Sequence, residues 1–445
     1  MTTGVYPPPR ITGAPEGRYG ERLLAAWLTT GRPADLNEHL AWYGPAPLGR
    51  PGGHEHPMMD AVAHAGLTGR GGAGFPTATK LRAVARAKRP GRILVANGME
   101  SEPAASKDKA LLRLAPHLVL DGIALAAEAI GADEAHLCVA PSRSGLDQRL
   151  RGLISERRRA GLDPIEVQVH TPPHHYVSSE SSALVNWLGG GEAKPTTTPP
   201  RTAERGVAGR PTLVDNVETL AHLALIARYG PGWFRSRGTS ESPGTTLVTL
   251  AGAVADPGVY EAEFGWSLRD VLGLARPAAN ARAVLVGGYF GTWLPLQHIA
   301  DLAFSGRGLA AAGANPGAGV LAVLPAQACG LAETARVLAY LAGQSARQCG
   351  PCRSGLPATA DDFAQLAFGH CDRDGWERLE RHIRQLPGRG ACKHPDGGAR
   401  LAASALRAFA PDVRRHLESG PCPAALHTPP LLPIPAAAIQ DGAWR

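Results

Sequence analysis

A glycine-rich loop carries the residue types in this chain that best suit chemistry. Four glycines fall within six residues, and they are Gly69, Gly71, Gly72 and Gly74. Their bare backbone allows a large ligand to approach closely. Arg70 lies among them and Lys80 closes the segment, so we expect an anionic ligand. N–H groups beside cations suit a phosphate-bearing cofactor.

The same loop leaves two other interpretations open. Its spacing matches G-x-G-x-x-G, the dinucleotide fingerprint, which is meaningful only where a strand enters the loop and a helix leaves it. Residues 58–65, just before the loop, predict a helix, so a standard Rossmann turn is not expected. A flexible surface loop is the other alternative.

Acidic residues follow a predicted buried strand over 92–97. Asn97 ends the strand, and Glu100 and Glu102 follow it with one serine between them. Open α/β sheets bind ligands beyond the carboxyl ends of their strands. The two carboxylates could therefore point the same way and accept hydrogen bonds from ribose hydroxyls. A solvated acidic loop is the alternative.

Two more polar segments could belong to the same pocket. Tyr176 and Glu180 lie in a polar loop that opens a predicted helix. Asp215, Asn216 and Thr219 lie at the start of another. Either segment could serve only to cap its helix. Their occurrence in the same α/β region as the glycine loop favours a shared site.

Three cysteines form a separate candidate site. Cys349 and Cys352 have C-x-x-C spacing between predicted helices, and Cys392 follows forty residues after Cys352. Such a set suits zinc, a redox disulfide or an iron–sulfur cluster. The sequence has no second C-x-x-C to complete a four-cysteine zinc site, and thioredoxin-like chemistry would need a strand before the pair. Two structural thiols are the remaining alternative.

Composition and charge narrow the classes of protein. The 445 residues suffice for two to four domains, and the formal charge of +7 is spread without a basic block. We therefore expect no nucleic-acid binding, whereas an acidic protein partner suits the charge. The first residues lack the features of a signal peptide, and we expect no membrane span. Seven unevenly spaced cysteines favour a cytoplasmic chain with reduced thiols.

The pattern of apolar residues predicts an α/β region followed by a β-rich and a helical region. Strands over 92–97, 135–140 and 165–170 are predicted to alternate with helices over 58–65, 111–131 and 146–159. This alternation predicts a mainly parallel sheet. Further strands are predicted over 245–260, 283–289 and 320–324, with a short helix over 266–274. After residue 324, helices are predicted to about residue 420.

The order of these segments resembles one protein family. The glycine loop is followed by N-x-x-E-x-E-P, Y-V-x-x-E-x-x-A-L-x-N, V-x-N-V-E-T, the β-rich region and C-x-x-C-R-x-G. No single motif is specific, but five in one order are. Over roughly residues 55–415 the sequence resembles the NADH-binding flavoprotein subunit of respiratory complex I, which is shared with NAD-linked hydrogenases and formate dehydrogenases.

The resemblance implies the fold and the cofactors. It implies an α/β class with a Rossmann-like FMN- and NADH-binding domain, a small β-grasp domain of the soluble-ligand-binding type, and a C-terminal four-helix bundle that carries a [4Fe–4S] cluster. The expected parts are an N-terminal arm over 1–55, the α/β domain over 56–240, the β-grasp domain over 241–325, the iron–sulfur domain over 326–422 and a flexible tail over 423–445.

The resemblance also implies roles for residues. The FMN phosphate and ribityl chain would be held by Gly69, Arg70, Gly71, Gly72, Ala73, Gly74, Phe75 and Lys80. Phe75 could also stack on NADH, and Asn97 would contact the flavin. The remaining pocket residues would be Glu100, Glu102, Tyr176, Glu180, Asp215, Asn216 and Thr219. The cluster ligands would be Cys349, Cys352 and Cys392.

The implied function is that of an FMN-dependent NADH dehydrogenase subunit. Hydride would pass from NADH to FMN, so binding geometry provides the catalysis and no side-chain base is needed. Single electrons would then pass, through the cluster, to a ferredoxin or a quinone-linked partner. We therefore expect electron-transfer partner subunits, and any membrane association would be through them. The alternative is a non-catalytic family member that scaffolds a redox complex.

The chain departs from the family at the cluster loop. Where the family has its first cysteine, this chain has Ala346. A methyl group cannot replace a thiolate, so a cluster with four cysteine ligands cannot form. Ser345, His394 or Cys329 could supply a fourth ligand, the cluster could be [3Fe–4S] or a labile [4Fe–4S], or the site could be empty. We expect some cluster, because three cysteines are retained.

The nucleotide pocket departs from the family too. Met99 stands where the family has an aspartate, and Ser181 stands where it has a second glutamate. An acidic residue near the ribose 2′-hydroxyl normally repels the extra phosphate of NADPH. We therefore expect a relaxed preference between NADH and NADPH.

Overall fold

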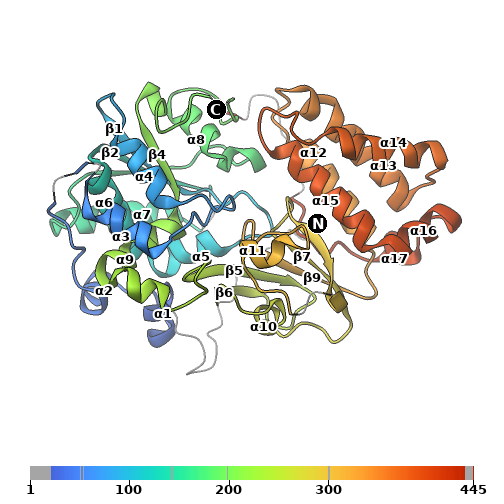
Figure 1. Cartoon of the computed structure of the whole chain (residues 1–445), viewed down its shortest axis with the longest axis horizontal. Coiled ribbons are helices and arrows are strands. Elements are labelled where there is room, and N and C mark those ends of the chain that lie inside the picture. The colour runs from blue at the N-terminus through green and yellow to red at the C-terminus, as the bar shows by residue number, and fades with distance from the viewer. Residues whose placement is uncertain are drawn as a thin grey trace.

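The computed structural model describes residues 22–435 and 444–445, apart from positions 51, 54, 142–143, 198 and 299–300. The first 21 residues of the expected arm and segment 436–443 of the expected tail lie outside the described residues. Figure 1 shows a parallel-sheet region on the left, a mixed sheet below the centre and a group of helices on the right.

The parallel sheet has four strands. In spatial order they are β3 (Val167–His170), β2 (Ala132–Val139), β1 (Arg92–Gly98) and β4 (Thr212–Asn216). All neighbouring strands are parallel, which confirms the sequence prediction. Parallel topology places all four carboxyl ends at one edge, and the register pairs Asn97 with Asn216 there. The sheet thereby brings together polar residues that are far apart in the sequence.

Helices cover both faces of this sheet, which explains why the middle of β1, residues 93–96, is apolar. On one face, Leu94 and Ala96 share a core with α6 (Pro116–Ile130) and α9 (Val217–Arg235). On the other face, Ile93 and Val95 pack with α8 (Ser181–Leu188). The remaining elements of the region are α3 (Pro57–Ala65), α4 (Thr77–Ala85), α5 (Lys107–Leu114), α7 (Leu146–Arg159), η1 (Tyr176–Ser179) and η2 (Val207–Gly209).

The single amphipathic helix expected over 111–131 is wrong. The chain forms α5 and α6 instead, and the two are bent by 96° at their junction. Pro116 disfavours the helical conformation of the residue before it, and Ala115 has φ −133° and ψ 50°. α6 is also buried on almost every side, because helices and sheet surround it. In the described part of the chain, no single helix is long and apolar enough to cross a membrane.

The second sheet is mixed and has five strands. Their order is β6 (Gly258–Glu263), β5 (Thr245–Gly252), β9 (Val320–Pro325), β7 (Ala281–Val286) and β8 (Thr292–Pro295). β5 pairs with β9 in parallel, and the other pairs are antiparallel. Val248, Val284 and Val323 face α10 (Leu268–Gly273), while Leu285 and Ala322 face the C-terminal helices. This region also holds η3 (Leu296–His298) and α11 (Gly306–Ala310).

The C-terminal region is helical, as expected. Its elements are α12 (Gly330–Gly343), the π-helical turn η4 (Pro351–Gly355), α13 (Leu356–Phe368), α14 (Arg373–Gln385), α15 (His394–Ala408), α16 (Ala410–Ser419) and α17 (Pro423–His427). The helices share an apolar core with one face of the mixed sheet, in which Leu338 and Phe363 are fully buried. The N–H of Trp293 on β8 donates to the hydroxyl of Ser404 on α15. The helices are therefore packed onto the sheet.

The expectation of a loose tail after Pro423 is wrong for the part that is described. α17 begins at Pro423, and Leu432 is buried. The N–H groups of Leu431 and Leu432 both donate to the buried carboxylate of Glu333 on α12. The ring of Trp444 lies 4.0 Å from that of His175, between centroids. Apolar side chains and backbone hydrogen bonds therefore tie this segment down, despite its proline-rich composition.

The described part of the N-terminal arm also packs down. It forms α1 (Ala25–Thr30) and α2 (Leu36–Tyr43). Leu23 and Leu24 are buried in the core of the parallel-sheet region. Their N–H groups donate to Glu261 on β6, so the arm contacts the mixed sheet as well.

Candidate functional site

The carboxyl ends of β1 and β4 form the floor of the candidate site. The side-chain amide of Asn216 donates to the backbone oxygen of Asn97 at 3.3 Å and to Asp108 at 2.7 Å. The amide of Asn97 donates to the backbone oxygen of Ser179 at 2.9 Å. The two predicted asparagines are therefore adjacent, and each side chain also holds a neighbouring loop.

The glycine loop borders this floor and is open to solvent. Residues 71–76 are all exposed, and the ring of Phe75 is 45% exposed. A Cβ added to Gly71 would lie 3.5 Å from the Cβ of Asn216, which places the loop against the strand end. Gly72 has φ +105°, a conformation that L side chains rarely adopt. The loop thus offers an accessible backbone with few side chains, as the sequence predicts.

Lys80 and Asp215 meet at the side of the same floor. Lys80 lies on α4, and its Nζ donates to Asp215 Oδ1 at 3.2 Å and to the backbone oxygen of Val214 at 3.2 Å. Burial raises the pKa of Asp215, and Lys80 partly offsets this. Oδ2 of Asp215 is buried and has no partner among the described residues. A half-exposed ammonium and an unsatisfied carboxylate oxygen thus face the site together.

Arg70 is buried, and protein groups already hold its guanidinium. Its guanidinium donates to the backbone oxygens of Thr68 and Thr245 and lies 4.7 Å from the centroid of the Phe264 ring. It lines a cavity of about 200 Å³ between the loop and the mixed sheet. Burial lowers the pKa of Arg70 to about 10, against a raising effect of Glu218. The Arg70 backbone N–H donates to Thr219 at 2.9 Å, which is the role of Thr219 here.

A buried ionic network lies beneath the loop and was not predicted from the sequence. Lys107 Nζ lies 2.7 Å from Asp108 Oδ1 and 2.8 Å from Glu218 Oε2, and all three residues are buried. Glu218 Oε1 accepts hydrogen bonds from the hydroxyl of Thr246 and the N–H of Leu247 on β5. Lys107 and other cations hold the pKa of Glu218 well below its usual range although burial raises it. The available signal was that Glu218 is the glutamate of V-x-N-V-E-T and that Lys107 follows N-x-x-E-x-E-P.

Glu100 and Glu102 do not point the same way. Glu100 accepts hydrogen bonds from the N–H groups of Asp108 and Lys109, so it caps α5. Glu102 accepts the hydroxyl of Tyr176 at 2.8 Å and the N–H of Tyr289 at 2.9 Å. Both carboxylates are buried. Groups of the protein therefore already donate hydrogen bonds to both carboxylates. Tyr176 is one of the two donors to Glu102 named above.

Glu180 lies at the mouth of the site. Its exposed carboxylate accepts hydrogen bonds from the N–H groups of Ser182 at 2.8 Å and Ala183 at 3.2 Å. Glu180 therefore caps α8, which is one of the two roles considered for this segment from the sequence. Met99, by contrast, is fully buried among Ile93, Val95 and their neighbours. The methionine therefore fills the core, which explains an apolar residue directly after the strand.

The three cysteines of the second site lie together. Burial raises the pKa of Cys352, and its neighbours Cys349 and Cys392 add to the effect. Cys352 lies in η4, and Cys392 lies just before α15. Burial also raises the pKa of Cys392, and the nearby Glu180 carboxylate contributes to that shift. The cysteine group is therefore close to the α8 end of the first site.

The structure separates the candidates for a fourth ligand. Ser345 is buried, and its hydroxyl donates to the backbone oxygen of Cys352. His394 Nε2 lies 2.7 Å from the backbone oxygen of Leu341, and its Nδ1 has no partner among the described residues. Cys329 precedes α12, whereas the cysteine loop follows the end of that 14-residue helix, roughly 21 Å away. Cys329 Sγ lies instead 3.9 Å from Nε2 of His416.

The fold and the two sites define a class of protein: a nucleotide-binding α/β protein with a second centre built from thiols. Comparison with family models gives the same division. Residues 62–225 match the Nuo51 FMN-binding domain, and residues 332–416 match the NADH-ubiquinone oxidoreductase-F iron-sulfur binding region.

Comparison with individual proteins identifies the family. The F subunit of NADH-quinone oxidoreductase from Mycobacterium tuberculosis (strain ATCC 25618 / H37Rv) is 32% identical over 383 residues, which cover 82% of this chain and 86% of that protein. The F 2 subunit of the Rhizobium meliloti (strain 1021) enzyme is 31% identical over 379 residues, with 82% and 90% covered. The chain belongs to the family of NADH-quinone oxidoreductase F subunits and has its FMN-binding and iron–sulfur-binding regions.

A solved structure is also similar. The structure of an NAD+-reducing [NiFe]-hydrogenase in the air-oxidised state matches with a TM-score of 0.77 and 33% sequence identity. The match covers 95% of this chain and 69% of that chain. The likeness therefore extends over nearly the whole α/β chain and is not confined to one of its regions.

The Glu102 carboxyl should make stability depend on pH. Burial raises the pKa of Glu102 from 4.5 to about 7, so the folded state binds its proton more tightly than the unfolded state does. The protonated Glu102 carboxyl therefore stabilises the fold in full at pH values below 4.5, its pKa in the unfolded chain. This stabilisation is lost as pH rises through about 7, its pKa in the folded protein. We expect the stability of wild type relative to Glu102→Gln to fall by on the order of 3 kcal/mol between those pH values.

Urea unfolding at a series of pH values measures this difference. Glu204→Gln, which changes an exposed glutamate, is the matched control and should leave the pH dependence as in wild type. A wild type and a Glu102→Gln variant whose unfolding midpoints run parallel across this range would contradict the prediction.

Proposed function

We propose that this chain takes hydride from NADH onto bound FMN and passes electrons singly, through an iron–sulfur cluster, to a ferredoxin-like or other electron-transfer subunit. One observation carries the proposal: the exposed glycine loop, Lys80 and the unpartnered carboxylate oxygen of Asp215 meet at the carboxyl end of β4, within the region that matches an FMN-binding domain. Glu180, which begins α8, lies near enough to Cys392 of the second site to interact with it electrostatically. Electron transfer between two bound cofactors needs such closeness.

The residues at the strand ends fit FMN. An exposed loop without side chains suits close approach of a phosphate, and Lys80 adds a cation to it. The unpaired Oδ2 of Asp215 is an acceptor for a ligand hydroxyl. When bound, FMN supplies a ring that accepts hydride and releases electrons one at a time. The backbone N–H of Arg70 donates to the side-chain hydroxyl of Thr219, and this hydrogen bond fixes the start of the loop.

The remaining residues position the dinucleotide. Phe75 exposes an apolar ring for stacking, and Glu180 presents a carboxylate at the entrance. Glu102, Tyr176 and Asn97 hold the surrounding loops in place through their mutual and backbone hydrogen bonds. The protein thus contributes binding and orientation, and no group in the proposed site needs to act as a base.

Cys349, Cys352 and Cys392 are proposed to hold the cluster. Three neighbouring thiols are the ligand type that iron–sulfur clusters require. Ser345 and His394 remain the candidates for the fourth position. The proposed division of the chain follows: an FMN and NADH domain of Rossmann-like type over 56–240, a β-grasp domain over 241–325 and a four-helix iron–sulfur domain over 326–422. Because relatives of the chain are named as subunits, we propose that partner subunits receive the electrons.

Lys80→Met should reduce FMN binding. The variant loses the ammonium proposed to face the phosphate, so we expect it to retain several-fold less FMN per chain after gel filtration. Fluorescence of the released flavin, divided by protein concentration, measures this. Lys88→Met, on an exposed lysine beyond α4, is the matched control and should retain the wild-type amount. Equal FMN content in a folded Lys80→Met protein would contradict the role of Lys80.

Ala346→Cys should stabilise the cluster. It adds a thiol to the cysteine loop, so we expect anaerobically purified protein to approach about four iron atoms per chain and to lose them more slowly in air than wild type does. Iron and sulfide assays measure this, with Ala342→Cys, one turn earlier at the end of α12, as the control. Wild-type protein without bound iron or sulfide would overturn the cluster proposal.

Ser181→Glu should sharpen the choice of nucleotide. The new carboxylate, beside Glu180, would repel the 2′-phosphate of NADPH. We expect kcat/KM for NADPH to fall at least several-fold more than kcat/KM for NADH, from a wild type that accepts both. Ser155→Glu, on the exposed face of α7, is the control. A wild type already strict for NADH would show that the relaxed preference is wrong.

A further inference from the structure

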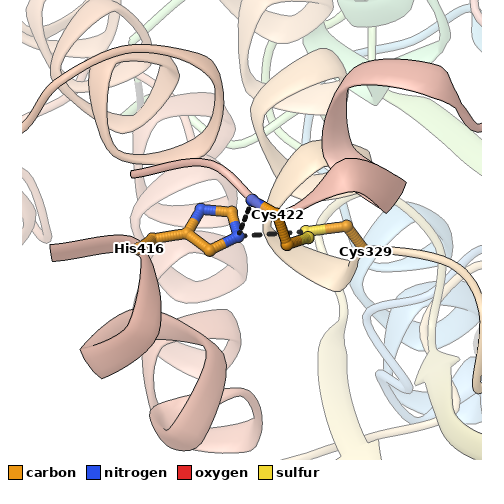
Figure 2. A group of neighbouring side chains, drawn as sticks. All are labelled: Cys329, His416 and Cys422. Carbon is orange, nitrogen blue, oxygen red and sulfur yellow. Dashed lines mark hydrogen bonds between the residues drawn. The ribbon is translucent and has the colours of Figure 1, made fainter. Parts of the chain in front are cut away.

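A second group of potential ligands lies in the C-terminal helices, apart from the cluster cysteines. Cys329 directly precedes α12, His416 lies in the last turn of α16, and Cys422 directly precedes α17. Figure 2 shows the three side chains converging from these separate elements. Their Sγ and imidazole nitrogen atoms all lie within 4.8 Å of one another. The proposed function uses none of the three.

The spacing of the ligand atoms suits a tetrahedral metal ion. Cys329 Sγ lies 3.9 Å from His416 Nε2. Zinc binds sulfur at about 2.3 Å and imidazole nitrogen at about 2.0–2.1 Å, so two such ligands at a tetrahedral angle lie about 3.6 Å apart. Small side-chain movements would therefore bring the group to ligation distances.

The imidazole of His416 is already in the form that a metal needs. Its Nδ1 donates to the backbone oxygen of Leu366 at 3.0 Å. The backbone N–H of Cys422 donates to Nε2 at 3.2 Å, so Nε2 carries the lone pair, and it lies 3.9 Å from Cys329 Sγ. A metal bound at Nε2 would replace that hydrogen bond. Ligating histidines are typically held by such an outer hydrogen bond from the second ring nitrogen to a carbonyl.

The surroundings of the sulfurs agree with a metal site. Cys329 and His416 are buried, at 3% and 2% exposure, while Cys422 is half-buried and leaves a way in from solvent. Burial and the neighbouring Cys422 raise the pKa of Cys329, whereas the N–H groups of Ala332 and Leu331 at the start of α12 lower it. Those N–H groups would support a thiolate once a cation neutralises it.

We propose that Cys329, His416 and Cys422 bind one Zn²⁺ ion, with water or another small ligand at the fourth position. Two thiolates and one imidazole are ligands that zinc prefers. Binding forms two Zn–S bonds and one Zn–N bond, two thiol protons pass to solvent, and no electron is transferred. The ion would fasten α16 and the segment that begins at Cys422 to the start of α12, and so tie down the C-terminal segment.

Serine substitutions test the proposal without removing the helix starts. Cys329 and Cys422 both occupy N-cap positions, where serine is a favoured residue, so Cys329→Ser and Cys422→Ser should fold. Cys371→Ser, at a buried cysteine elsewhere in these helices, is the matched control. A Cys349→Ser/Cys352→Ser double variant removes any zinc bound at the cluster cysteines.

The full-length protein is loaded with Zn²⁺, passed over a weak chelating resin and assayed by plasma mass spectrometry. We expect about one zinc per chain in wild type, Cys371→Ser and the double variant, and its loss in Cys329→Ser and Cys422→Ser. Co²⁺ should give a sulfur-to-cobalt charge-transfer band in the same proteins only. A strong chelator should lower the melting temperature of wild type by several degrees and leave that of Cys422→Ser unchanged.

Three results would overturn the proposal. The first is equal zinc content in wild type and Cys422→Ser. The second is zinc that disappears only when the cluster cysteines are changed. The third is a peptide map that shows Cys329 and Cys422 joined in a disulfide in protein purified without reductant. Loss of iron and sulfide with zinc retained would instead count only against the proposed cluster, so the two proposals can fail separately.

Discussion

The buried pair of Lys107 and Glu218 is the interaction on which the rest of the site depends. Glu218, at the start of α9, accepts a charged hydrogen bond from Lys107 on α5 and two more hydrogen bonds from β5 of the mixed sheet. Its Oε1 also lies 4.0 Å from Nε of Arg70, beneath the glycine loop. One carboxylate thus fixes four segments at once. Removing one partner of a buried ion pair typically costs about 3–5 kcal/mol, because the other charge is left uncompensated.

Around that pair, the topology decides what lies together. Parallel strands bring Asn97 and Asn216 to one edge, and the Arg70–Thr219 hydrogen bond sets the glycine loop over it. Glu180, at the start of α8, then links this edge to the cysteine group near Cys392. The nucleotide pocket and the thiols are therefore neighbours although more than 200 residues separate Glu180 from Cys392. Such an arrangement suits a subunit whose reaction requires only that two cofactors be held close together.

Local patterns in the sequence predicted the strands, the order of the regions and the residues at the strand ends. Side-chain direction could not be predicted in this way. The Arg70 side chain lies between the loop and the mixed sheet, close to Glu218 and Phe264. Glu102 accepts hydrogen bonds from Tyr176 and Tyr289. The break between α5 and α6 could have been predicted, since a proline disfavours the helical conformation of the residue before it. The group of Cys329, His416 and Cys422 could not be predicted from the sequence, because its first two members are 87 residues apart and meet only in the folded chain.

The central claim is that hydride from NADH arrives at an FMN held over the ends of β1 and β4. Anaerobic titration of the FMN-loaded protein with NADH, followed by the absorption of the oxidised flavin, tests it most directly. We expect the flavin band to be lost with about one to two equivalents of NADH, since each flavin accepts one hydride and a cluster can accept further electrons from it. An FMN-loaded, folded protein whose flavin band is unchanged by excess NADH would contradict it.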